Sequence, residues 1–229
     1  MIKLGVPSKG RLMQDTFDWF GKRGVTLTRT GSEREYAGAV QGIDGVSLVM
    51  LSAGEIPREL AAGRIHLGVT GSDMVREKLA HWDVQAEPLA QMGFGFANLV
   101  IAVPQAWIDV ETLDDLDAVA AAFRANHGHR LRIATKYHRL VREHLKKHDV
   151  ADYLLVDSQG ATEGTVKNLT AEAIADITTT GATLEANHLK VLKGDPIHAS
   201  QANLFLSLTA EVDDEGQAIL ATFKSKLGL

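Results

Sequence analysis

Residues 172–192 read EAIADITTTGATLEANHLKVL. The run 173–177, apolar except for Asp176, is typical of a buried strand, because strands covered on both faces read as largely apolar segments. It ends directly in a turn rich in threonine, and a helical pattern over 183–192 follows at once. We therefore predict a strand, turn and helix unit of an α/β fold at this point of the chain.

The turn of this unit is suited to a phosphate group. Free backbone N–H groups and the positive end of the helix dipole would converge where the helix begins. Glycine would let the backbone approach an anion without a Cβ in the way. A threonine-capped turn without a ligand is the alternative, since threonine is a good N-cap. The candidate phosphate-binding residues are Thr178, Thr179, Thr180, Gly181, Ala182 and Thr183.

Two acids are candidates for the sugar that would carry this phosphate. Asp176 stands at the end of the predicted strand, where a carboxylate can accept hydrogen bonds from sugar hydroxyls. An acid followed by a threonine and glycine turn therefore favours a phosphorylated ribose. Glu163, in the glycine-containing stretch 160–164, could be a second acid facing a sugar or a metal, with a surface loop as the alternative.

The strand and helix unit recurs along the chain. Such alternation favours mostly parallel sheets with right-handed crossovers, and ligands of such sheets bind beyond the carboxyl ends of the strands. We expect two lobes, the first made of residues 1–91 with 190–229 and the second, carrying the threonine-rich turn, of residues 92–189. The predicted strands that begin these units are 2–6, 46–51, 65–69, 131–135 and 173–177, and a late strand at 197–206 could return to the first sheet.

Two more polar turns begin predicted helices. Ser8, Lys9, Gly10 and Arg11 place two cations at a helix start, where cations are mildly unfavourable, so an anion contact is favoured over a solvated turn. The turn 70–73, which contains Gly71 and Asp73, could contact a ligand or only cap its helix.

Composition excludes several classes of function. The chain has 229 residues, a net charge of −5 and no cysteine, which excludes disulfides, thiol catalysis and a broad basic surface for nucleic acid. The uncharged segment 88–108 contains glutamine, asparagine, glycine and proline, so two buried strands fit it better than a membrane span. No leader precedes the first strand, and we expect a cytoplasmic protein.

Other motifs are weak or missing. His144 and His148 share one helix face, but the glutamate of HExxH is absent and a solvated face is favoured. Residues 93–95 lack the third glycine of a dinucleotide fingerprint, and no GxxxxGK[ST] stretch exists.

Four segments, in order, resemble the catalytic subunit of ATP phosphoribosyltransferase, the first enzyme of histidine biosynthesis. They are SKGRL at 8–12, EIP at 55–57 with GVTGSD at 68–73, RIATKY at 132–137, and DITTTGATL at 176–184. The family often has an arginine shortly before the second segment, where this chain reads LSAG, so we expect Arg34 to carry more of the pyrophosphate clamp. His66 stands where an aspartate is common.

The resemblance implies a fold and an assembly. The fold would be the two-lobed, periplasmic-binding-protein-like (type II) arrangement, with mixed, mostly parallel sheets, helices on both faces and a cleft between the lobes. Because the chain ends at Leu229, it resembles the short form, without a C-terminal regulatory domain. That form works with a separate regulatory subunit resembling histidyl-tRNA synthetase, in a hetero-oligomer built on homodimers.

The resemblance also implies a reaction, in which N1 of ATP attacks C1 of phosphoribosyl pyrophosphate and displaces pyrophosphate. Asp176, Glu163, Arg11 and Arg34 would be catalytic, and residues 176 and 178–183 would bind phosphoribosyl pyrophosphate. Mg²⁺ would be held by the substrate phosphates rather than by fixed protein ligands. The residues implied for ATP are Ser8, Lys9, Gly10, Arg11, Gly71 and Asp73.

Two alternatives share parts of this pattern. A two-lobed solute-binding protein without catalysis would have the same fold, but it should carry a secretion signal. A purine-salvage phosphoribosyltransferase would share the substrate, but it typically has two adjacent acids before the loop, where this chain has Ala175 and Asp176.

Overall fold

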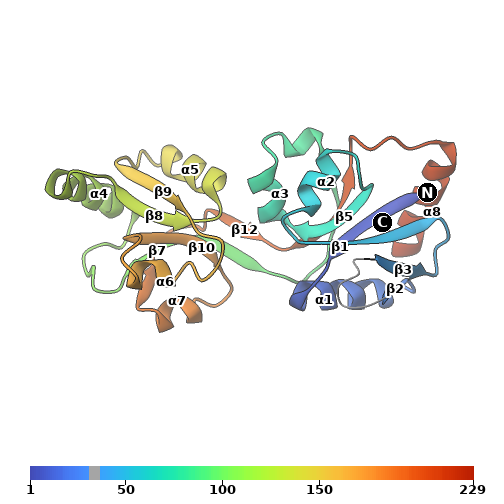
Figure 1. The fold of residues 1–229 in the computed structure, drawn as a ribbon, viewed down its shortest axis with the longest axis horizontal. Helices are drawn as coiled ribbons and strands as arrows, with labels where there is room; N and C mark the ends of the chain where they lie inside the picture. The colour runs from blue at the N-terminus through green and yellow to red at the C-terminus, as the bar shows by residue number, and fades with distance from the viewer. Residues whose placement is uncertain (31–36) are drawn as a thin grey trace. The chain divides into compact units, whose positions relative to one another are not determined.

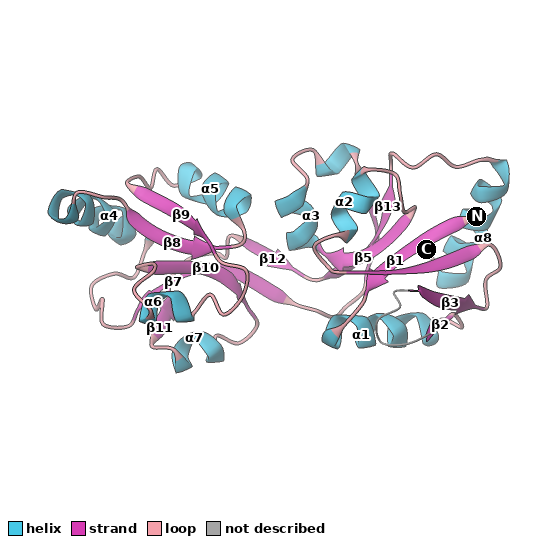
Figure 2. Cartoon of the chain, viewed as in Figure 1, coloured by secondary structure: helices cyan, strands magenta, loops and turns pink. Residues whose placement is uncertain are grey.

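The structure is a computed structural model, and it describes residues 1–30 and 37–229. These residues form two compact units (Figure 1). The first contains Met1–Phe96 and Gln201–Leu229, and the second contains Ala97–Ser200. Each unit has one β-sheet with helices on both faces (Figure 2), as expected for the predicted α/β class.

The sheet of the first unit has the strand order β2-β3-β4-β1-β5-β13-β6. The central strand β1 pairs in parallel with β4 and β5, whereas β13 runs antiparallel to both β5 and β6. The strands are β1 (Ile2–Pro7), β2 (Thr26–Thr30), β3 (Ala37–Gln41), β4 (Val46–Leu51), β5 (Leu67–Gly71), β6 (Ala86–Gln91) and β13 (Ala202–Ser207).

Helices cover both faces of this sheet, and β1 is therefore buried at every position except Lys3. Phe20 of α1 and Phe223 of α8 are fully buried in one core, and Leu60 of α2 lies in a second one. The helices of this unit are α1 (Gly10–Gly21), α2 (Ile56–Ala61), α3 (Ser72–Lys78), the short 3₁₀ helix η1 (Trp82–Val84) and α8 (Asp214–Leu227).

The sheet of the second unit has the order β11-β7-β10-β8-β9, with β12 also paired to β7. The strands β10, β8 and β9 are parallel, and β7 is antiparallel to β10. The strands are β7 (Ala97–Pro104), β8 (Leu131–Thr135), β9 (Tyr153–Asp157), β10 (Ala173–Thr178), β11 (Leu189–Val191) and β12 (His198–Ser200). The helices are α4 (Leu113–His127), α5 (His138–Lys147), α6 (Gly164–Lys167) and α7 (Ala182–Ala186).

The unit boundaries differ from those expected from the sequence, 92 and 190. Met92 is buried in the core of the first unit, and its N–H donates to the carbonyl of Ala202 at 3.0 Å. Residues 190–200 belong to the second unit because β11 and β12 both pair with β7. The late strand expected at 197–206 is therefore two strands, one in each unit.

The uncharged segment 88–108 forms strands, as the sequence indicates. It contains the end of β6, all of β7 and the glycine-containing crossing between them. Among the described residues, no helix has both the length and the apolar character needed to span a membrane.

Candidate active site

The threonine-rich loop follows β10, the central strand of the second sheet. Strand β10 lies between β7 and β8, and its burial falls from complete at Ala173 to partial at Thr178. Asp176 lies near the carboxyl end of this strand, with its side chain 18% exposed. The chain then turns through 179–181 into α7. This is the edge where ligands of such sheets bind.

The loop is closed by its own hydroxyl groups. The Gly181 N–H donates to Thr178 Oγ1 at 2.8 Å, and the Ala182 N–H donates to Thr180 Oγ1 at 3.3 Å. The sequence predicts free N–H groups in this turn. These two amides are instead hydrogen-bonded inside the loop. Each hydroxyl oxygen that accepts such a bond keeps its own proton for donation to a ligand. The loop thus offers hydroxyl donors where free amides were expected.

Gly181 is needed for the turn itself. Its φ is +79°, a left-handed conformation that costs other L-residues roughly 1–2 kcal/mol. A Cβ built on Gly181 would meet no protein atom within 4 Å. Gly181 lines a cavity of about 690 Å³, which Thr178, Thr179 and Thr180 also line.

The helix after the loop is shorter than expected. The pattern predicted a helix over 183–192, but α7 spans only Ala182–Ala186, and His188 adopts a positive φ of 57° before β11 begins. Strand β11 then pairs with β7, so backbone pairing in the sheet overrides the helical pattern. With so few aligned peptide groups, the dipole of α7 adds little to anion binding.

One cavity joins the loop to both candidate acids. It has a volume of about 290 Å³, near the lower limit of about 300 Å³ for ligand pockets. Glu163 and Asp176 both line it, which the sequence could propose but not establish. The other lining residues are Ala97, Ile177, Thr178, Thr179, Thr180, Thr183 and Leu184.

Lys136 is a cation beside Asp176 that was not among the candidates from the sequence. It follows β8, the parallel neighbour of β10, and its Nζ lies 3.8 Å from Asp176 Oδ1. A usable signal was present, because a lysine directly after a buried strand in the RIATKY segment must stand at the same sheet edge as Asp176.

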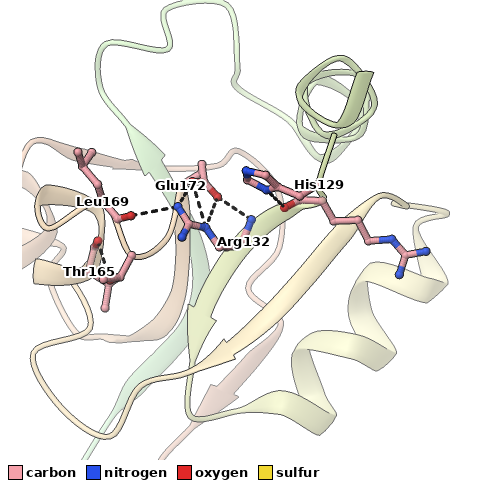
Figure 3. A network of polar contacts seen from close by, with 7 residues as sticks. His129, Arg132, Thr165, Leu169 and Glu172 are labelled. Atoms are coloured by element: carbon pink, nitrogen blue, oxygen red, sulfur yellow. Dashed lines mark hydrogen bonds and ion pairs between the residues drawn. The ribbon is translucent and has the colours of Figure 1, made fainter. Parts of the chain in front are cut away.

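An ion-pair network joins the amino ends of β8 and β10, away from Asp176 and the loop (Figure 3). The Arg132 guanidinium donates to Glu172 through Nε and Nη2, with Nη2 to Oε1 at 2.5 Å, and its backbone N–H reaches Oε2 at 2.7 Å. Arg132 Nη2 also donates to the Leu169 carbonyl at 3.0 Å. Burial opposes ionisation of Glu172, but the hydrogen bonds from Arg132 outweigh it and lower the pKa of that carboxyl. The network positions the strand that carries Asp176.

The first unit gathers its own polar turns at one edge. Ser8–Arg11 connect β1 to the first turn of α1, and Gly71–Asp73 connect β5 directly to α3; the two strands are parallel neighbours. Lys9 is the N-cap of α1 without a side-chain capping bond, and Gly10 has a φ of +74°. The Arg11 side chain is 93% exposed, with its Nε 3.5 Å from Asp15 Oδ2. Asp73 is buried in the first turn of α3.

The two candidate histidines, on α5 and at its end, do not line the cavity of about 290 Å³. Arg34 lies outside the described residues. The His144 and His148 rings are in contact, tilted by 48° with their centroids 4.6 Å apart, and burial, His148 and Lys147 lower the pKa of His144. Within residues 1–30 and 37–229, no group of three or more histidine, aspartate or glutamate side chains is arranged to hold a metal ion.

Fold and site together define a class of protein. A mixed α/β fold, with an acid and a hydroxyl-lined glycine turn at one strand end, is typical of proteins that hold a phosphorylated sugar. The sequence model of the family "HisG: ATP phosphoribosyltransferase" matches residues 52–227. The chain belongs to this HisG family. It is a pentosyltransferase that catalyses the first step of histidine biosynthesis.

Curated relatives agree with this assignment. The ATP phosphoribosyltransferase of Cereibacter sphaeroides is 69% identical over 228 residues, which cover 100% of this chain and 96% of the relative. That of Mesorhizobium japonicum is 50% identical, with 92% of this chain and 91% of the relative covered. For the Afipia carboxidovorans enzyme, 49% identical, the match covers 93% of this chain but 66% of the relative. Relatives of two lengths are therefore similar to this chain.

Solved structures show the fold. A chain of the ATP phosphoribosyl transferase (HisG:HisZ) complex from Thermotoga maritima matches with a TM-score of 0.75 at 21% identity, covering 100% of this chain and 97% of that one. Holo ArgBP from T. maritima matches with a TM-score of 0.53 at 13% identity, covering 99% and 88%. The periplasmic-binding-protein-like fold is thus confirmed, while family membership sets aside the solute-binding and purine-salvage alternatives.

Proposed function

We propose that the cavity in the second unit binds phosphoribosyl pyrophosphate for the reaction of this family. That reaction transfers the 5-phosphoribosyl group to N1 of ATP and releases pyrophosphate. The observation that carries the proposal is that Asp176, Glu163 and the loop hydroxyls line a single cavity. The hydroxyls of Thr178, Thr179, Thr180 and Thr183, which all line this cavity, donate to the 5′-phosphate.

The carboxylates act on the sugar. As the bond to pyrophosphate breaks, positive charge develops on the ribose ring, and a fixed negative group stabilises it. Asp176 accepts from a ribose hydroxyl and faces this charge, with Glu163 as the second acid. The nucleophile is a ring-nitrogen lone pair, so the site needs orientation more than a strong base.

Mg²⁺ fits the donor set of this cavity. Carboxylate oxygens are the ligands that hard cations prefer, and Asp176 and Glu163 supply them beside the space for the substrate phosphates. We propose that the ion is held mainly by those phosphates, with the two carboxylates as outer partners. When bound, it offsets the negative charge that develops on pyrophosphate.

We assign ATP to the turns of the first unit. Ser8, Lys9, Gly10 and Arg11 lie at the same sheet edge as Gly71 and Asp73, and the exposed cations of the first turn suit a triphosphate. The pyrophosphate contact assigned to Arg34 stays a prediction from the sequence.

The proposed setting is a cytoplasmic hetero-oligomer. The T. maritima match belongs to a HisG:HisZ complex, which supports a regulatory subunit as partner for this chain. We propose the same kind of partner here, resembling histidyl-tRNA synthetase, on a catalytic homodimer.

Pyrophosphate release tests the proposal. The chain, alone and co-expressed with a regulatory subunit, is assayed with phosphoribosyl pyrophosphate and either ATP, adenine or guanine as acceptor. We expect release with ATP only. Release with free adenine or guanine would instead assign the cavity to salvage chemistry, and an unchanged rate for Asp176→Asn would remove that residue from the site.

A further inference from the structure

A lysine at the edge of the phosphoribosyl site has no role in the chemistry described above. Lys136 is the first residue after β8, and β8 pairs in parallel with β10. Its Nζ lies 3.8 Å from Asp176 Oδ1. The two side chains are 33% and 18% exposed, so their attraction is screened less than that of a surface ion pair.

The ammonium group contacts the residue that follows it in the chain. Nζ lies 5.1 Å from the centroid of the Tyr137 ring, within the range of a cation–π contact. Tyr137 is 1% exposed, and its N–H donates to Thr135 Oγ1 at 2.9 Å. Thr135 and Tyr137, the two sequence neighbours of Lys136, are both buried. The backbone of Lys136 is therefore held on both sides, and its ammonium group lies beside Asp176.

The two oxygens of Asp176 are used differently. Oδ1 accepts the N–H of Ile177 at 2.8 Å and faces Lys136. Within the part of the chain that the structure describes, Oδ2 has no hydrogen-bond partner. A carboxylate held at one oxygen has a fixed rotamer, and its second oxygen is available for a ligand hydroxyl.

The charge balance of the cavity gives the lysine a second effect. Asp176 and Glu163 line the same small cavity, and an anionic sugar diphosphate would be opposed by two uncompensated carboxylates. One cation beside Asp176 reduces this repulsion without occupying the space for the sugar.

We propose that Lys136 is a positioning residue of the phosphoribosyl site. Its ammonium group fixes Asp176 through Oδ1, so that Oδ2 meets a ribose hydroxyl. This inference rests on the proposed function of Asp176, and its effect on the substrate passes through that carboxylate.

The test compares five variants in the holoenzyme: Lys136→Met, Lys136→Arg, Asp176→Asn, the double variant Lys136→Met with Asp176→Asn, and Lys146→Met as control. Lys146 is an exposed lysine on α5. Pyrophosphate release gives kcat and KM for each substrate, and thermal unfolding gives Tm.

For Lys136→Met we expect kcat/KM for phosphoribosyl pyrophosphate to fall about tenfold, the loss of one charge-assisted contact. KM for ATP should stay within about twofold, since that substrate does not use Asp176. Lys136→Arg should recover most of the loss, and Lys146→Met should match the wild type. In the Asp176→Asn background, Lys136→Met should cost nothing further, because its partner is already gone.

The outcomes separate the two proposals. An unimpaired Asp176→Asn variant removes Asp176 from the proposed site, and the role inferred for Lys136 is lost with it. If Asp176→Asn is impaired while Lys136→Met equals the wild type, only the role of Lys136 is lost. Equal losses from Lys136→Met in both backgrounds would show that the lysine acts without Asp176, which also overturns the inference. If Lys136→Met lowers Tm as well as activity, the Lys136→Arg and double variants still test the role of Lys136, because their rates are measured at a temperature where every variant is folded to the same extent.

Discussion

The polar turns of the two units meet the solvent in different ways. In the second unit, the loop after β10 is tied by two hydrogen bonds to its own hydroxyls, and Asp176 is only 18% exposed. In the first unit, the turn before α1 has no side-chain capping bond, and Arg11 is 93% exposed. The loop proposed to bind phosphoribosyl pyrophosphate is thus ordered by its own contacts, whereas the cations proposed to bind ATP are exposed. Preorganised contacts contribute more to catalysis than flexible ones of the same chemistry.

The largest loss of activity is expected from a change at Asp176, the partly buried acid that precedes the loop in the second unit. Asp176→Ala should lower kcat/KM for phosphoribosyl pyrophosphate about 100-fold, equivalent to about 3 kcal/mol, because a fixed charge-stabilising group is lost. Steady-state pyrophosphate release measures it. Asp157→Ala is the matched control, since Asp157 is likewise an acid near the carboxyl end of a strand of this sheet but does not line the cavity. Equal losses in both variants would show a general effect of charge at this edge.

Gly181→Ala should have the next largest effect. The added Cβ meets open space, so the cost is the left-handed backbone, roughly 1–2 kcal/mol. We expect weaker binding of phosphoribosyl pyrophosphate by calorimetry, together with a lower free energy of unfolding in urea. Gly21→Ala, at the end of α1 with open space and no positive φ, should lose neither. Wild-type affinity in Gly181→Ala would mean that the loop does not need its observed shape.

Arg11→Ala tests the exposed cations at the start of α1 in the first unit. The ion pair with Asp15 is exposed, so stability should change by less than about 0.5 kcal/mol. KM for ATP should rise about fivefold if the cation contacts the triphosphate. Urea unfolding and initial rates at varied ATP give the two numbers, with Asp15→Ala as control for the ion pair. A rise in KM for phosphoribosyl pyrophosphate alone would move Arg11 to the other substrate.

The smallest effect concerns the amino ends of β1 and β5. His66 Nδ1 accepts the Lys3 N–H at 3.0 Å, and burial, with a smaller effect of Lys3, lowers the pKa of His66. The unfolded chain therefore binds this proton at a higher pH than the folded chain. Stability is complete above about pH 6.5 and declines as the pH falls below it, with a slope of at most about 1.4 kcal/mol per pH unit for one proton.

The check is urea unfolding between pH 5 and 8 for the wild type and His66→Gln. The pH dependence should be shallower in the variant, although His144 also contributes in the same direction. Parallel curves for the two proteins would show that His66 titrates alike in both states.

How much was predictable depends on the range of the interactions involved. The strand 173–177, the turn after it and the family segments follow from local pattern, and the structure has them where the sequence places them. The end of α7 and the strands β11 and β12 do not, because three-residue strands exist only through pairing with β7. The same pairing moved the unit boundary from 190 to 201.

The site shows the same division. That Asp176 and the loop share a cavity follows from their adjacency in the sequence. Lys136 is forty residues away from Asp176, as positions 136 and 176 show, and only the parallel pairing of β8 with β10 brings it near. The use of two loop amides by Thr178 and Thr180 depends on side-chain rotamers, on which a sequence pattern is silent.

The position of β13 has a consequence during synthesis. This strand lies between β5 and β6, yet it leaves the ribosome after the whole second unit. A nascent chain can complete the sheet of residues 97–200 while β5 and β6 still await the strand that joins them. Unpaired strand edges recruit other chains, so the first unit is exposed to misassembly for as long as translation of the insert takes.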